Sequence, residues 1–131
     1  MNRIPTIILV SLFSSLFIFA QDQSTNSVPK IAGIIRAKDA DFFYNQTATI
    51  TGKVAQVTFR PQVVFLNLDE AYPNSPFAGV IFTKDTNGFG DLPALMGKNV
   101  AVTGLVKKFN DKPEIVLTNA SQLKVVEPEK K

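Results

Sequence analysis

The sequence contains neither cysteine nor histidine. Without cysteine there can be no disulfide and no lipoprotein-type anchor, so the core alone must stabilise the fold. Without histidine the chain also lacks the commonest general base and, together with the missing cysteine, the commonest zinc ligands. Ser–His and Cys–His nucleophile chemistry and Cys/His zinc sites are therefore excluded. We expect a protein that is not an enzyme, with no cofactor and no metal site.

The first twenty residues have the pattern of a secretory signal. Arg3 is their only charge, an apolar run interrupted only by serines extends over Ile7–Phe19, and Ala20 precedes a polar stretch. A run of about thirteen residues is too short to cross a bilayer as a helix, which needs about twenty. We predict a signal peptide at residues 1–20, export to the periplasm or the medium, and no stable membrane insertion after cleavage. An uncleaved membrane anchor is the alternative.

The charge balance limits the kind of nucleic-acid interface that the protein could have. The chain has 14 Lys and Arg against 11 Asp and Glu; without the signal, which carries one Arg and no acid, 13 stand against 11, a net charge of +2. Domains that hold nucleic acid mainly through phosphates usually show a clear basic footprint. Any such binding here must therefore depend on local clusters of charge.

The chain after residue 20 is long enough for one domain with one core, since 131 residues less 20 leave 111. We predict a flexible N-terminal arm at residues 21–36, a single domain at 37–126 and a disordered tail at 127–131. The last part of the arm, Val28–Arg36, is apolar and fits either an edge strand or the start of a helix.

Hydrophobic residues first alternate with a period of two at residues 48–59, which predicts a strand with one buried face. The apolar set includes Ile50 and Val54 and then shifts by one residue, so that it continues at Val57. Such a shift predicts a β-bulge at residues 55–56, which would bend the strand as a small barrel requires.

Further elements follow from the same patterns. Val64, Leu66 and Leu68 form the aliphatic face of a second strand. The expected elements are a brief helix at 37–46 with Asn45 in a left-handed turn, strands at 48–59, 63–69 and 77–84, a short helix at 91–97 between an Asp91 cap and Gly97, and a hairpin at 98–117 turning at Asn110 and Asp111.

The strings FLNLD, YPNSPF, AGVIF, GKNVAVTGLVKKF and KPEIVLTNASQL, with a short helix between the third and the fourth, resemble small exported bacterial OB-fold domains of the nucleic-acid-binding type. The resemblance covers residues 37–126. It implies an all-β fold with one short helix, a five-stranded Greek-key barrel that binds ligands rather than transforming them.

The resemblance also implies a site across the second and third strands, between the loops at residues 59–62 and 107–112. Each loop places an aromatic residue beside a cation, the pairing that single-strand binders use to stack bases and hold phosphates. The ligand-binding candidates are Lys53, Phe59, Arg60, Phe65, Asn67, Lys84, Lys107, Phe109 and Lys112.

Simpler roles exist for several of these residues. Phe59 and Phe65 could belong to the core or pack a loop, Tyr72 could pack a turn, and the lysines at 107, 108 and 112 could form a solvated hairpin end. A thermonuclease-type reaction would need a metal-holding acid cluster with arginines. Only two arginines follow the signal, and no spaced acid–arginine set accompanies them.

The sequence therefore favours a non-catalytic OB-fold module of an exported protein, with weak binding of single-stranded nucleic acid as the first hypothesis. A periplasmic or secreted module that binds a protein, peptide, saccharide or cation is the alternative.

Overall fold

The computed structural model describes residues 31–127. The predicted signal peptide, residues 21–30 of the predicted arm and residues 128–131 of the predicted tail lie outside this range. The strands are β1 (Ile31–Arg36), β2 (Thr47–Arg60), β3 (Val63–Leu68), β4 (Phe77–Phe82), β5 (Asn99–Leu105), β6 (Lys107–Phe109), β7 (Lys112–Val116) and β8 (Leu123–Val125). Short 3-10 turns join them: η1 (Ala37–Phe42), η2 (Thr83–Phe89), η3 (Pro93–Leu95) and η4 (Ala120–Gln122).

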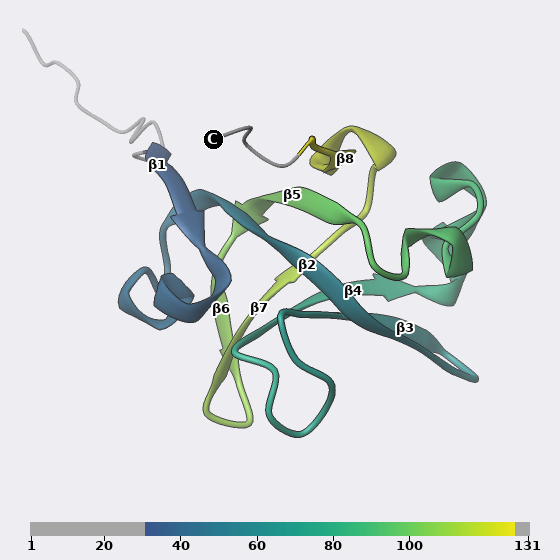
Figure 1. Cartoon of the computed structure of the whole chain (residues 1–131), viewed down its shortest axis with the longest axis horizontal. Helices are drawn as coiled ribbons and strands as arrows, with labels where there is room; N and C mark the ends of the chain where they lie inside the picture. Colours follow the sequence, from purple (N-terminus) through teal and green to yellow (C-terminus); the bar gives the residue numbers. More distant parts are fainter. Residues whose placement is uncertain (1–30, 128–131) are drawn as a thin grey trace, which may run out of the picture.

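The long strand β2 organises the fold because it belongs to two ladders. Its first half pairs with β5 on one side and, in parallel, with β1 on the other, whereas its second half pairs with β3. The predicted bulge is confirmed, since the register with β3 shifts between Val54 and Gln56. The extra residue, Ala55, bends β2 and lets one strand serve both sides of the molecule (Figure 1).

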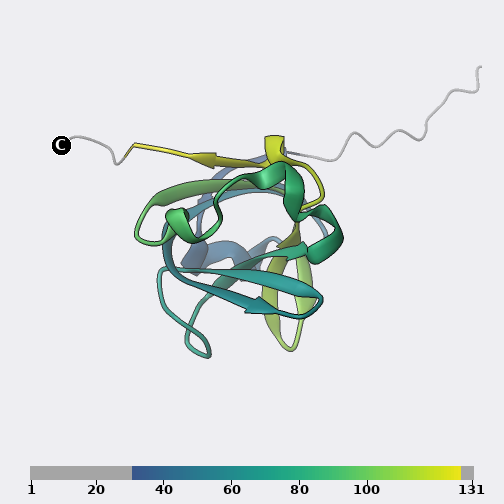
Figure 2. The ribbon, with the colours of Figure 1, turned by 90° about the vertical axis from the view of Figure 1, so that its right-hand side faces the viewer.

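The strand order matches that of an OB fold, as the sequence predicts. β2, β3 and β4 form an antiparallel meander, β4 pairs in parallel with β7, and β5 returns to pair with β2. The resulting order is β6-β7-β4-β3-β2-β5-β8. Figure 2 shows these strands curving around a common centre. In the terms of the OB fold, β2, β3, β4, β5 and β7 are the five barrel strands.

The outermost two of the five barrel strands, β5 and β7, approach each other at Gly104. A Cβ atom at this position would lie 2.6 Å from Cγ2 of Ile115, a separation that no real side chain adopts. Next to it, the side-chain amide of Gln122 donates to the Thr103 carbonyl on β5 at 3.0 Å and to the Val116 carbonyl on β7 at 3.5 Å. One glutamine thus bridges the seam between the two strands.

The core lies inside the curved sheet and is almost entirely aliphatic. The predicted face of the second strand is confirmed, because Val64, Leu66 and Leu68 are all buried. The largest fully buried side chains include these two leucines together with Phe77, Ile50, Ile81, Ile115, Leu117, Val54, Val100, Val102 and Val106. Burial of this apolar area is the main stabilising contribution in a chain without disulfides.

Several segments differ from the sequence-based expectation. Ile31–Arg36 is strand β1, which confirms the edge-strand alternative for this stretch. This part of the predicted flexible arm therefore belongs to the fold: it pairs with β2, and Ile35 is buried. The third strand ends at Phe82, since the chain then enters η2. The predicted helix at 91–97 is shortened to the single turn η3, which the positive φ of Gly97 (81°) terminates.

The local turn predictions are confirmed. The expected helix at 37–46 takes the form of the 3-10 turn η1 followed by Asn45 at φ 67°, and the β6–β7 turn places Asn110 and Asp111 at φ 49° and 64°. The N-cap residue of η3 is Leu92 instead of the predicted Asp91, although the Asp91 carboxylate does accept from the Ala94 amide at 3.3 Å. Such left-handed positions favour asparagine, aspartate and glycine.

Candidate functional site

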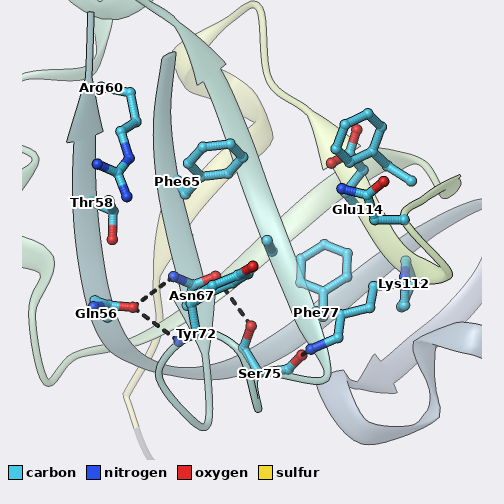
Figure 3. Close-up of a pocket in the computed structure, with 14 residues that line it drawn as sticks. Gln56, Thr58, Arg60, Phe65, Asn67, Tyr72, Ser75, Phe77, Lys112 and Glu114 are labelled. Carbon is cyan, nitrogen blue, oxygen red and sulfur yellow. Dashed lines mark hydrogen bonds between the residues drawn. The ribbon is translucent and has the colours of Figure 1, made fainter.

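A groove of about 350 Å³ lies on the outer face of the sheet (Figure 3). It crosses β2, β3, β4 and β7, between the loop at residues 69–76 and the β6–β7 hairpin. These two loops project from the same end of the molecule (Figures 1 and 2). The groove is lined by Gln56, Thr58, Arg60, Phe65, Asn67, Tyr72, Ser75, Phe77, Ala78, Phe109, Asn110, Lys112, Pro113 and Glu114.

The register of the sheet brings these residues together in rows. In one row Gln56, Asn67, Ala78 and Glu114 lie side by side on four neighbouring strands. In the next row Thr58 lies opposite Phe65. Since alternate residues of a strand point to the same face, these rows are two residues apart, or about 7 Å. The floor of the groove is thus formed by the sheet itself, so the backbone hydrogen bonds between the strands hold its residues in place.

A buried polar network fixes one wall of the groove. The Asn67 amide nitrogen donates to Oε1 of Gln56 at 3.0 Å, and the same oxygen accepts from the backbone amide of Tyr72 at 2.9 Å. The Ser75 hydroxyl donates to Oδ1 of Asn67 at 3.1 Å. Asn67 therefore ties β2 and β3 to the loop at 69–76, as the dashed lines in Figure 3 show.

Lys112 fixes the same loop from the opposite side. Its ammonium group donates to the carbonyls of Pro73 and Ser75, the latter at 3.2 Å. Because the charge is directed into backbone carbonyls, this lysine holds the loop against β7 instead of facing the centre of the groove. The two walls are thereby joined at one end.

Aromatic side chains surround the space between the walls. Phe65 lies in the middle of the groove on β3 and is partly exposed. Tyr72 on the loop at 69–76 is 74% exposed, and Phe109 at the end of β6 is 55% exposed. Phe77, by contrast, is buried and belongs to the core. Three accessible rings from three separate elements therefore border one groove.

Glu114 is the single acid among the described residues that line the groove. Its side chain comes from β7 and is about half-buried, and burial raises the pKa of its carboxyl above the ordinary value. The positive charge of Lys107, its partner on β6, partly offsets this effect. Figure 3 shows Glu114 across the groove from Arg60 and Gln56.

The structure brings five of the nine residues predicted from the sequence to this groove, namely Arg60, Phe65, Asn67, Phe109 and Lys112. Two of the five, Asn67 and Lys112, have their polar groups bonded to the loop at 69–76. Arg60, Phe65 and Phe109 are left to contact a ligand directly.

The other four predicted residues, Lys53, Phe59, Lys84 and Lys107, do not line the groove. Phe59 alternates with Thr58 and Arg60, so it points to the opposite face of β2. Lys84 lies in η2 and pairs with Asp85 at 3.4 Å. Lys53 precedes the bulge in β2, and Lys107 reaches the site only through its charge on Glu114.

The sequence reasoning missed Gln56, Thr58, Tyr72, Ser75 and Glu114. Gln56 and Thr58 could have been found from the bulge, because its phase shift turns every second residue after it outward. Glu114 could have been found from its alternation with the buried Ile115. Ser75 had no such signal, because its role depends on a contact with another strand.

Two further observations bear on function. Within residues 31–127, no group of three acidic side chains is placed to hold a metal ion. In the same part of the chain, no helix has the length and hydrophobicity to cross a membrane.

Comparisons with known proteins give a likeness of fold only. No protein-family model matches the chain, and no curated protein matches it. One similar solved structure is a putative aspartyl-tRNA synthetase from Leishmania major Friedlin, at 12% identity and a TM-score of 0.45 over 75% of this chain. The match spans only 21% of the synthetase chain.

A second similar structure is the second OB-fold domain of replication protein A from Methanococcus maripaludis. The identity is 18% and the TM-score 0.46, over 74% of this chain and 100% of that domain. The assignment of an OB fold to this protein rests on the strand order and register described above.

Proposed function

We propose that the protein is a non-catalytic binding module that takes single-stranded nucleic acid into the groove on β2, β3, β4 and β7. The proposal rests on the three accessible aromatic side chains that surround the groove, Phe65, Tyr72 and Phe109. Every base has a π-face, so such rings bind an unpaired strand with little regard to its sequence.

The exposure of these rings supports the proposal. Phe109 and Tyr72 are each more than half exposed, so they contribute little to the core. Large apolar side chains gathered at one exposed site indicate a surface for interaction. Phe82, at the end of β4, is 41% exposed and pairs with Val63, which in turn pairs with Arg60. It therefore extends the apolar surface beyond the groove.

The charges around the groove set the character of the binding. Among the described residues, two cations line the groove, Arg60 and Lys112. The charged group of Lys112 is bonded to backbone carbonyls, whereas that of Arg60 is not. The carboxylate of Glu114, across the groove from Arg60, repels negatively charged groups of a ligand. We therefore infer that stacking supplies most of the affinity, with one or two phosphates held near Arg60, and that the affinity is modest.

The proposed non-catalytic role rests on the composition, since the chain has no histidine or cysteine for nucleophilic chemistry. Export is proposed on the pattern of residues 1–20 alone. An exported protein of this kind would meet nucleic acid released from cells.

The test is a titration of fluorescently labelled single-stranded DNA and RNA of about twelve nucleotides, followed by anisotropy. F109A is expected to weaken binding by roughly 5- to 150-fold, which corresponds to the loss of one stacked base. F42A is the matched control, because Phe42 is 75% exposed on η1 and does not line the groove. Absence of binding at low salt, or an equal loss in F42A, would contradict the proposal.

A further inference from the structure

Glu114 occupies a position in the groove that a nonspecific single-strand binder does not require. Its direct partners in the sheet are Lys107 on β6 and Ala78 on β4, and the side chain of Ala78 is a single methyl group. The methyl group leaves the carboxylate uncovered on the β4 side. The acid therefore lies across the groove from Arg60, beside the space in which a base stacked on Phe65 would lie (Figure 3).

The carboxylate forms no ion pair within the described residues, although Lys107, its register partner on β6, lies close enough for its charge to lower the pKa of the carboxyl. The ion pairs found there join Lys84 to Asp85 and Lys108 to Asp111, and neither includes Glu114. An ionised carboxylate only accepts hydrogen bonds, through two oxygens. A ligand that fills the groove displaces water from this carboxylate, so the ligand must itself supply hydrogen-bond donors to it. A phosphate cannot, because it has the same sign of charge.

We propose that Glu114 reads a guanine base, accepting hydrogen bonds from its two neighbouring Watson–Crick-edge donors. The proposal rests on the proposed function and adds a base preference to it. Single-stranded nucleic acid presents this edge freely, and recognition of unpaired bases commonly combines stacking with bonds to it.

The chemistry of the four bases separates guanine from the others. Guanine places the N1–H and N2–H donors side by side, so that both carboxylate oxygens are satisfied in a bidentate arrangement. Cytosine and adenine each present one amino group beside a ring-nitrogen lone pair, which repels the second oxygen. Thymine and uracil flank their single N–H with two carbonyls. A good bidentate pair discriminates strongly between bases.

The experiment uses the full folded chain and five labelled dT oligomers that differ at one central position: guanine, inosine, adenine, cytosine or thymine. Inosine lacks only the 2-amino group of guanine. At pH 8 the wild-type protein is expected to bind the guanine oligomer at least about fivefold more tightly than each of the others. E114Q should bind guanine and inosine equally, because its amide keeps one acceptor oxygen and places an NH2 donor where the carboxylate has its second oxygen.

Two controls keep the result interpretable. E70Q makes the same change of charge at an exposed acid that does not line the groove, and it should keep the preference for guanine. Binding of the all-thymine oligomer by E114Q shows that the groove is intact. Equal wild-type affinity for all five oligomers, or a preference for adenine or cytosine, would overturn the role of Glu114 and leave the proposed function standing. Failure to bind any oligomer would overturn both.

Discussion

The hydroxyl of Ser75 donates a 3.1 Å hydrogen bond to Oδ1 of Asn67, and both side chains are almost completely buried, at 3% and 4% exposure. Asn67 in turn donates to Gln56, whose Oε1 also accepts from the backbone of Tyr72. The position of the exposed Tyr72 ring therefore depends on a buried amide at the base of its loop.

The first prediction concerns this amide. N67A leaves the buried Ser75 hydroxyl without its acceptor, so we expect a loss of about 1–3 kcal/mol in the free energy of unfolding. Urea denaturation measures it. N74A changes an exposed residue of the same loop and should alter stability by less than about 0.5 kcal/mol. Equal stability of N67A and wild type would show that the network contributes nothing.

The second prediction concerns the seam between β5 and β7. G104A places a methyl group 2.6 Å from Cγ2 of Ile115 and 3.1 Å from Nε2 of Gln122. The strands must separate or Gln122 must leave its carbonyl partners, at a cost of typically about 1–3 kcal/mol. G88A is the matched control, because a Cβ there meets nothing within 4 Å. A thermal melt of G104A that overlays the wild-type curve would refute the close approach.

The third prediction follows from the pKa of Glu114, which burial raises although Lys107 lowers it in part. An acid whose pKa is higher in the folded state binds its proton more tightly there. Its ionisation therefore lowers the free energy of unfolding as pH rises above the ordinary glutamate pKa of 4.5. E114Q should therefore be more stable than wild type at pH 7 and equally stable at pH 3. Paired urea titrations at the two pH values measure the difference, and a less stable E114Q at pH 7 would contradict it.

The fourth prediction concerns salt. With one or two phosphates held near Arg60, the logarithm of the binding constant should fall with the logarithm of salt concentration with a slope of about −0.7 to −1.4. The slope is obtained by measuring the affinity for a labelled dT oligomer at several salt concentrations between about 50 and 200 mM. A slope steeper than about −3 would mean that a basic surface outside the groove holds the strand.

Local patterns in the sequence were sufficient for much of the fold. The bulge near Ala55, the left-handed turn at Asn45 and the hairpin turn at Asn110 each depend on residues adjacent in the chain, and the structure confirms all three. The site was harder to predict. The role of Lys112 depends on the carbonyls of Pro73 and Ser75, far away along the chain, and no local pattern contains that information.

The assignment of Phe59 to the site illustrates a different limitation. The sequence placed this ring beside Arg60 because the two are neighbours in the loop, although neighbouring strand residues point to opposite faces. The bulge that the sequence itself indicated already assigned Thr58 and Arg60 to the outer face. The sequence allowed Phe65 either a place in the core or a place in the site. Its partial exposure in the groove fits the second of these.

The bulge in β2 has a consequence for how this surface could change. Ala55 is the residue that the ladder skips, because Val54 pairs with Leu68 and Gln56 with the adjacent Asn67. Deleting it would leave this pairing continuous, so Gln56, Thr58 and Arg60 would still face outward while β2 lost the bend that the bulge gives it. A one-residue deletion at the bulge would therefore straighten β2 and shift the walls of the groove without changing which of its side chains line it.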